Sequence, residues 1–131
     1  LPNFPIPTAQ SHAGRLILGH LGGKSIVVMQ GRLHYYEGHS MQTVVYPVRV
    51  MQQLGAKTLI VTNAAGGLNP GFDVADIMLI TDHINMLGDN PLRGVNDERF
   101  GPRFSDMSNA YDKTLQQAAR DVAGQLNIKI R

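Results

Sequence analysis

The feature that most constrains the fold is a pair of short apolar segments separated by a helix-like stretch. Residues 25–30 (Ser-Ile-Val-Val-Met-Gln) and 57–62 (Lys-Thr-Leu-Ile-Val-Thr) predict strands, and the second is typical of a central strand covered on both faces. Between them, apolar residues of 40–54 recur with a nearly helical period. Pro47 marks the first turn of that helix or kinks it, and Gly55 stands where helices end. This order favours a parallel strand pair with a right-handed crossover, and hence an α/β fold.

The remaining segments extend the same pattern at both ends. Residues 15–21 predict a strand that forms a hairpin with 25–30 across the turn at residues 22–24. The other expected elements are an irregular proline-bearing segment at 1–10, a strand at 77–80 continued by 81–85, a helix at 108–126 with Ser108 as N-cap, and a strand beginning at 127. The helix carries one apolar stripe, formed by Tyr111, Leu115, Ala118, Val122 and Leu126.

Both ends of the chain look cut. It begins with Leu1 rather than Met, and the strand expected at 127–131 has nothing after it. We therefore expect residues 1–131 to be a single partial domain from a longer protein.

Composition excludes several classes of function. The hydrophobic share of 43% and charged share of 17% are those of a soluble globular protein. No apolar run approaches the length of about 18 residues that predicts a membrane span. The net charge is only +2 and the basic residues are scattered, which argues against nucleic-acid binding. There is no cysteine, and the acidic and histidine residues lack metal-ligand spacing.

The stretch with the highest density of functional side chains is residues 30–38, Gln-Gly-Arg-Leu-His-Tyr-Tyr-Glu-Gly. If it stays extended, alternation places Arg32, His34 and Tyr36 on one face and Leu33, Tyr35 and Glu37 on the other. The first face suits an anion and a neighbouring ring or sugar. An edge strand with an ordinary polar face is the alternative interpretation.

A second marker follows the strand at 57–62. Residues 63–67, Asn-Ala-Ala-Gly-Gly, are very small and lie where open α/β sheets bind ligands. They do not form a P-loop, because the Lys-Ser/Thr ending is missing; a tight strand-to-loop connection is the alternative. His12 lies in a small-residue turn and is a loop histidine or a ligand-binding one, whereas we expect His83 to be structural. Asp97, Glu98 and Arg99 in the long loop at 88–108 form either a metal or acid/base cluster or local ion pairs in a solvated loop.

Taken together, these stretches closely resemble the trimeric purine nucleoside phosphorylases over essentially the whole chain. The residues that carry the resemblance are 31–38 (Gly-Arg-Leu-His-Tyr-Tyr-Glu-Gly), 62–68 (Thr-Asn-Ala-Ala-Gly-Gly-Leu), 82–85 (Asp-His-Ile-Asn), 96–101 (Asn-Asp-Glu-Arg-Phe-Gly) and 107–112 (Met-Ser-Asn-Ala-Tyr-Asp). The resemblance implies a mixed β-sheet flanked by helices, the phosphorylase/hydrolase-like fold, here incomplete at both ends. It also implies a cytoplasmic homotrimer with no nucleic-acid or membrane partner and no metal or organic cofactor.

The reaction implied by the resemblance is phosphorolysis. Inorganic phosphate, a co-substrate, attacks the anomeric carbon of a purine nucleoside such as inosine or guanosine and displaces the base, with positive charge developing on the sugar. The resemblance makes His12, Arg32, His34, Asn63 and Ala64 phosphate-binding residues, with His34 also catalytic. It makes Tyr36, Ala64, Ala65 and Phe104 nucleoside-binding residues, Phe104 being lent to the sugar pocket of a neighbouring subunit.

Parts of the family's site are missing from this sequence. A Gly-Ser-Gly phosphate loop is expected before Leu1, and the purine-recognising Glu and Asn are expected after Arg131, so the isolated 131 residues are expected to be inactive. Methylthioadenosine phosphorylase is an alternative, although the sequences of residues 34–38 and 63–67 fit the purine nucleoside phosphorylases better. A catalytically dead domain that binds phosphate or assembles with other subunits is a third possibility.

Overall fold

The structure is a computed structural model that describes residue 2 and residues 4–131. Contacts divide the chain into two compact units, the first comprising residues 1–60 and 89–103, the second 61–88 and 104–131. The irregular segment expected at 1–10 is observed in its described residues; Leu1 and Asn3 lie outside them. No helix in the described part of the chain is long and apolar enough to cross a membrane.

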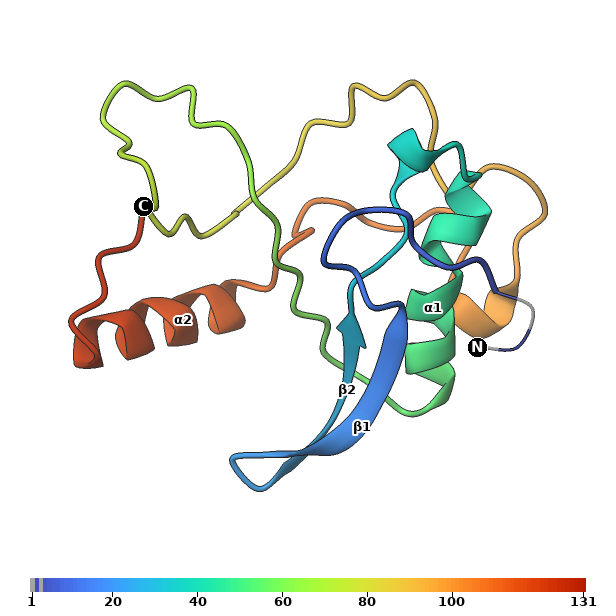
Figure 1. Cartoon of the computed structure of the whole chain (residues 1–131), viewed down its shortest axis with the longest axis horizontal. Coiled ribbons are helices and arrows are strands. Elements are labelled where there is room, and N and C mark those ends of the chain that lie inside the picture. Colours follow the sequence, from blue (N-terminus) through green and yellow to red (C-terminus); the bar gives the residue numbers. More distant parts are fainter. Residues whose placement is uncertain (1, 3) are drawn as a thin grey trace. The chain divides into compact units, whose positions relative to one another are not determined.

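The first unit contains the predicted hairpin. Strands β1 (Arg15–Leu21) and β2 (Lys24–Gln30) pair antiparallel, from Arg15 opposite Gln30 to Leu21 opposite Lys24 (Figure 1). The two turn residues, Gly22 and Gly23, have φ values of +55° and +74°. Two consecutive positive φ values characterise the tight turns that match strand twist, which is why glycine stands at both positions.

Helix α1 (Met41–Gln53) confirms the helical period of that segment. The Ser40 hydroxyl accepts a hydrogen bond from the first turn (3.1 Å), as an N-cap residue does. At the other end Gly55 has φ +98°, and the Ala56 N–H donates to the Met51 carbonyl (3.1 Å). This is a Schellman ending, which glycine favours because it lacks a Cβ. Pro47 lies buried within the helix rather than in its first turn.

The described core of the first unit is small. Leu33, Met41 and Met51 are buried there, and a cavity of about 40 Å³ adjoins Leu33 and Pro47. The Phe4 ring stacks on Tyr46 of α1 with ring centroids 5.6 Å apart, which attaches the amino-terminal segment to the helix.

The strand predicted at 57–62 is not observed. Its residues form no strand, and Ile60 is 84% exposed. The predicted parallel pairing with β2 across α1 is therefore wrong for this structure. A central parallel strand needs a hydrogen-bonded neighbour, and the described residues provide none for this segment.

In the second unit, the strands predicted at 77–80 and 127–131 are represented by one β-bridge. Ile77 and Ile130 form one parallel bridge, in which the Arg131 N–H donates to the Ile77 carbonyl (2.8 Å) and the Leu79 N–H donates to the Arg131 carbonyl (2.9 Å). The strands expected at 77–80 and 127–131 are thus reduced to a single bridge. Residues 81–85 do not extend it as a strand.

Helix α2 (Lys113–Gln125) begins later than predicted. Its N-cap is Asp112, whose carboxylate accepts a hydrogen bond from the Leu115 N–H (2.8 Å); Ser108 lies in the turn before it. Asp and Ser are similarly good N-caps, so the sequence pattern did not separate them. The predicted apolar stripe is largely exposed, and Ala123 is the buried residue of the helix.

Candidate functional site

The candidate site of the first unit begins where β2 ends. Gly31 turns the chain with φ +80°, and η1 (Tyr35–Glu37) is a single 3-10 turn. The stretch from Arg32 to Tyr36 is therefore not extended throughout, which corrects the simple alternation of faces. Leu33 points inward, with an exposed fraction of 1%, while Glu37 returns to contact His34.

His12 reaches this segment from the amino-terminal side. The Arg32 N–H donates to Nδ1 of His12 (3.1 Å), and the same nitrogen lies 2.9 Å from the Arg32 carbonyl oxygen. Gly31 makes this approach possible, because a Cβ added there would stand only 2.6 Å from Cα and Cβ of His12. The imidazole is thus held against the backbone of Arg32.

Three predicted site residues form a row of rings. The His12 and His34 ring centroids are 4.7 Å apart, and those of His34 and Tyr36 are 4.8 Å apart. Together with Arg32, these residues form what we call the histidine wall: His12, Arg32, His34 and Tyr36. The structure brings these four together from two separate stretches of the sequence.

The Glu37 carboxylate connects His34 to the backbone and side chain of the segment at 8–9. One carboxylate oxygen accepts hydrogen bonds from the Thr8 N–H (2.6 Å), the Thr8 hydroxyl (2.6 Å) and the Ala9 N–H (3.2 Å). The other accepts from the His34 N–H (2.6 Å) and lies 3.0 Å from Nδ1 of the same residue. A proton on Nδ1 leaves Nε2 as the ring nitrogen available to a ligand.

The electrostatics of Glu37 follow from these bonds. The Thr8 hydroxyl and N–H, with smaller contributions from His34, hold the pKa of the Glu37 carboxyl well below its usual range. The side chain is only 3% exposed, so an ionised carboxylate there requires such donors. Sequence reasoning did not select Glu37 or Thr8. The signal available was the spacing of His34 and Glu37, which is that of a capping box.

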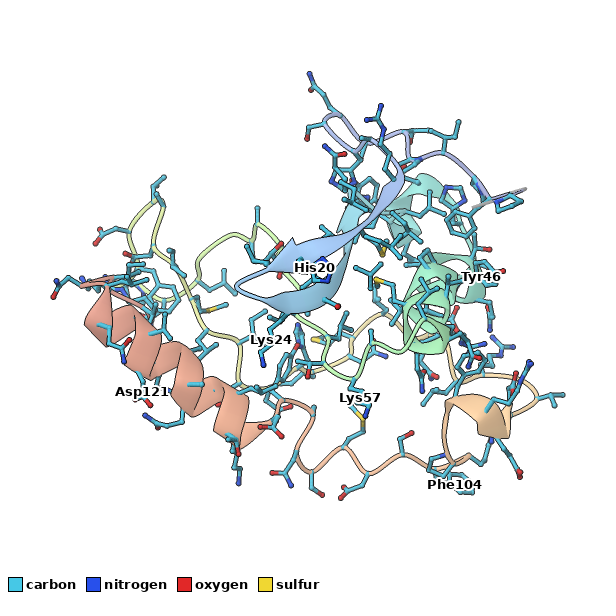
Figure 2. All side chains as sticks on the ribbon, turned by 90° about the horizontal axis from the view of Figure 1, so that it is seen from below. His20, Lys24, Tyr46, Lys57, Phe104 and Asp121 are labelled. Atoms are coloured by element: carbon cyan, nitrogen blue, oxygen red, sulfur yellow. The ribbon has the colours of Figure 1, made fainter. Side chains whose placement is uncertain are left out.

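The other predicted site residues belong to the second unit. Asn63, Ala64 and Ala65 are exposed, and the Asn63 amide donates to the Ala64 carbonyl (3.2 Å). Phe104 is 89% exposed (Figure 2). These residues and the histidine wall belong to different units. That they form one site therefore stays a prediction.

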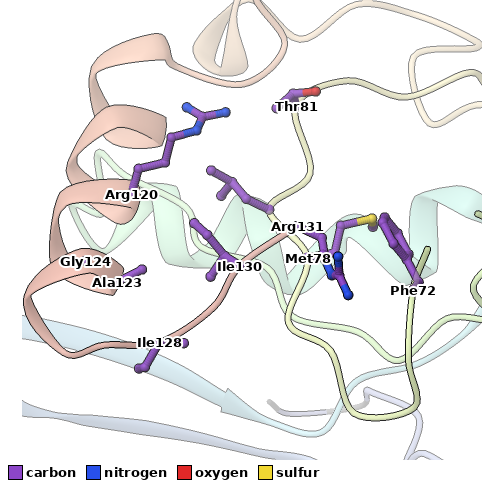
Figure 3. Close-up of a pocket in the computed structure, with 10 residues that line it drawn as sticks. Phe72, Met78, Thr81, Arg120, Ala123, Gly124, Ile128, Ile130 and Arg131 are labelled. Carbon is purple, nitrogen blue, oxygen red and sulfur yellow. The ribbon is translucent and has the colours of Figure 1, made fainter.

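A wide cavity of about 600 Å³ lies in the second unit, between α2 and the segments 72–81 and 128–131 (Figure 3). Arg131 at its edge donates to the Asp76 carboxylate (2.7 Å). The Asp73 N–H and then Arg131 lower the pKa of Asp76. None of the predicted site residues lines the cavity. Its charged groups are thus already paired in part, and its lining is mostly apolar.

Two other sequence candidates have local roles. Arg99 pairs with Asp97 through Nη2 (2.6 Å), and the described residues contain no cluster of His, Cys, Asp or Glu that could hold a metal. This agrees with local ion pairs in the loop at 88–108. The Tyr111 hydroxyl and Nδ1 of His83 are hydrogen-bonded, and their rings stack at 5.5 Å, which gives His83 a structural contact.

The chain is similar in sequence to several known proteins. The chain is 56% identical over 131 residues to purine nucleoside phosphorylase 1 of Geobacillus stearothermophilus, covering 100% of this chain and 48% of that protein. It is 62% identical over 122 residues to the purine nucleoside phosphorylase of Rattus norvegicus, covering 91% and 42%. The chain therefore spans about half the length of the curated relatives it matches.

A solved structure and a family model agree with these relatives. The structure of a Schistosoma purine nucleoside phosphorylase in complex with guanosine superposes with a TM-score of 0.87 at 48% identity, covering 95% of this chain and 45% of that one. This confirms the expected α/β fold class, which the described residues represent with one hairpin and two α-helices. The model of the phosphorylase superfamily matches residues 1–131. The chain therefore belongs to the phosphorylase superfamily.

Proposed function

We propose that the protein to which this chain belongs is a purine nucleoside phosphorylase, a pentosyltransferase. It catalyses the reversible phosphorolysis of purine ribonucleosides and deoxyribonucleosides to the free base and (deoxy)ribose 1-phosphate. The observation that carries the proposal is the histidine wall, in which two imidazoles and the Arg32 segment converge at the end of β2. Its setting is a chain that belongs to the phosphorylase superfamily.

The chemistry of the wall suits phosphate as the nucleophile. A bond forms between a phosphate oxygen and the anomeric carbon, the bond from that carbon to the base breaks, and the base leaves with its electron pair. The protein supplies no nucleophile, so its task is to orient the phosphate and stabilise charge. Arg32 offers a planar fork for two phosphate oxygens. His34, oriented through Nδ1 by Glu37, directs Nε2 at the phosphate and is the proposed catalytic residue.

The remaining residues complete the proposed pocket. His12 adds a second imidazole beside the phosphate, and Tyr36 contacts the nucleoside. Asn63 and Ala64 bring backbone groups to the phosphate, Ala64 and Ala65 line the sugar, and Phe104 serves a neighbouring subunit. These roles, the homotrimer and the cytoplasmic location rest on resemblance to the family. Inorganic phosphate is the co-substrate, and we propose no metal or organic cofactor.

The test is the phosphate dependence of inosine phosphorolysis, measured on the protein as it is naturally expressed. Loss of one charge-assisted hydrogen bond costs about 1.5–3 kcal/mol, so Arg32→Ala should raise the KM for phosphate roughly 10- to 150-fold. Lys24→Ala, which removes one positive charge at the start of β2, is the control and should leave that KM unchanged. An unchanged KM in Arg32→Ala would refute the phosphate site. An altered assembly state in place of altered kinetics would favour a scaffold.

A parallel measurement separates the two enzymatic interpretations. Turnover of inosine and guanosine well above that of methylthioadenosine is the expected result. Preference for methylthioadenosine would instead assign the protein to the methylthioadenosine phosphorylases.

A further inference from the structure

The loop that carries His12 is hydrogen-bonded to the segment at 32–37 at two points. One is the contact between His12 Nδ1 and the backbone of Arg32. The other is Glu37, which binds Thr8 and Ala9 from a position 28 and 29 residues further along the chain. Neither attachment involves pairing of strands, and each depends on hydrogen bonds made by a side chain.

The path from Thr8 to His12 is short and tightly turned. The Ala9 carbonyl accepts a hydrogen bond from the His12 N–H (3.2 Å), and Ser11 has φ +70°. A displacement of Thr8 is therefore passed through one turn to the imidazole, which lies 4.7 Å from the His34 ring. Glu37 contacts His34 with its other oxygen, so a single carboxylate aligns both histidines.

We propose that Thr8 is a positioning residue for phosphate binding, which through the Glu37 carboxylate holds the loop at 8–12 against Arg32 and His34. This inference rests on the proposed function, because it concerns binding of phosphate at that wall. Thr8 itself does not contact the ligand. It acts by fixing where His12 stands relative to His34.

The hydrogen-bond arrangement singles out the Thr8 hydroxyl. The Glu37 carboxylate is buried to 3% exposure and can only accept, and Thr8 provides two of its donors, both at 2.6 Å. Removing the hydroxyl leaves the backbone N–H in place but deprives a buried anion of one close donor. The carboxylate then has to seek another donor or water, which loosens the loop from the wall.

The experiment compares Thr8→Val, which keeps the shape and loses the hydroxyl, with Thr8→Ser, which restores it. Thr114→Val on α2 is the matched control for the same chemical change at an exposed position. Two quantities are measured on the naturally expressed protein: affinity for inorganic phosphate by calorimetry, and the nuclear Overhauser contact between the His12 and His34 rings.

Thr8→Val should weaken phosphate binding by about 3- to 10-fold and reduce the ring contact, with kcat at saturating phosphate changed less than about twofold. Thr8→Ser and Thr114→Val should match the wild type. Phosphate affinity in Thr8→Val equal to that in Thr114→Val, or no rescue by serine, would overturn the role of the hydroxyl. If Arg32→Ala also leaves phosphate affinity unchanged, the phosphate site itself is refuted. If Arg32→Ala weakens it and Thr8→Val does not, only the role of Thr8 fails.

Discussion

Replacement of Gly31 by alanine tests whether the close approach of His12 to the backbone at Gly31 determines the position of His12 in the histidine wall. The residue has φ +80°, and a left-handed backbone costs a residue with a Cβ about 1–2 kcal/mol. The new methyl group would also stand 2.6 Å from Cα and Cβ of His12 and 2.9 Å from its Cγ. Relieving such an overlap costs typically about 1–3 kcal/mol. The two effects sum to about 2–5 kcal/mol of lost unfolding free energy.

Gly38→Ala is a matched control for this substitution. Gly38 has φ +90°, and nothing lies within 4 Å of a Cβ added there, so it incurs the backbone cost without the overlap. Urea unfolding of the two variants should therefore differ by about 1–3 kcal/mol, with Gly31→Ala the less stable. Gly31→Ala should also weaken phosphate binding, because His12 has to move away from Arg32. Equal unfolding free energies for the two variants would refute the reasoning.

Further predictions concern acid stability and helix capping. Because hydrogen bonds lower the pKa of Glu37 in the folded state, its stabilisation is complete above the ordinary carboxyl pKa of about 4.5 and is lost as pH falls below it. The unfolding free energy should therefore decrease more between pH 6 and pH 3 in the wild type than in Glu37→Gln, and parallel decreases would contradict this. Asp112→Ala should cost α2 about 1 kcal/mol by urea unfolding, whereas Ser108→Ala should change stability by less than about 0.5 kcal/mol; the reverse order would restore Ser108 as the cap. Ser40→Ala should cost about 0.5–2 kcal/mol at the start of α1, with Ser40→Thr close to wild type in the same assay.

The candidate site shows which of its contacts the alternation of side chains along the sequence could predict. Alternation predicts that Arg32, His34 and Tyr36 share one face, and the rings of His34 and Tyr36 do stack on each other. The reason differs from the prediction, since the chain leaves the extended conformation and enters η1. Alternation also assigned Glu37 to the opposite face, whereas the 3-10 turn brings it back to His34. A residue's face depends on the local backbone, and a single turn reverses it.

Elements with local causes were predictable from the sequence. The hairpin follows from two apolar runs around a glycine pair, and α1 follows from its period, its Ser40 cap and Gly55. The strand at 57–62 was not, because a strand needs a hydrogen-bonded partner that no local pattern supplies. The same distinction holds for the start of α2, where two acceptable caps competed.

By itself, the sequence determined the hairpin, the position of α1, the residue types of the histidine wall and the family to which the chain belongs. These depend on neighbours within a few residues, or on motifs whose order along the chain is informative. Only the tertiary structure decided that His12 rests on the backbone of Arg32, that Gly31 leaves the space for it, and that Glu37 joins Thr8 to His34. The contacts of His12 with Arg32 and of Glu37 with Thr8 link residues 20 and 29 positions apart. Whether two such distant groups meet is determined by backbone geometry and packing, which the order of residue types does not encode locally.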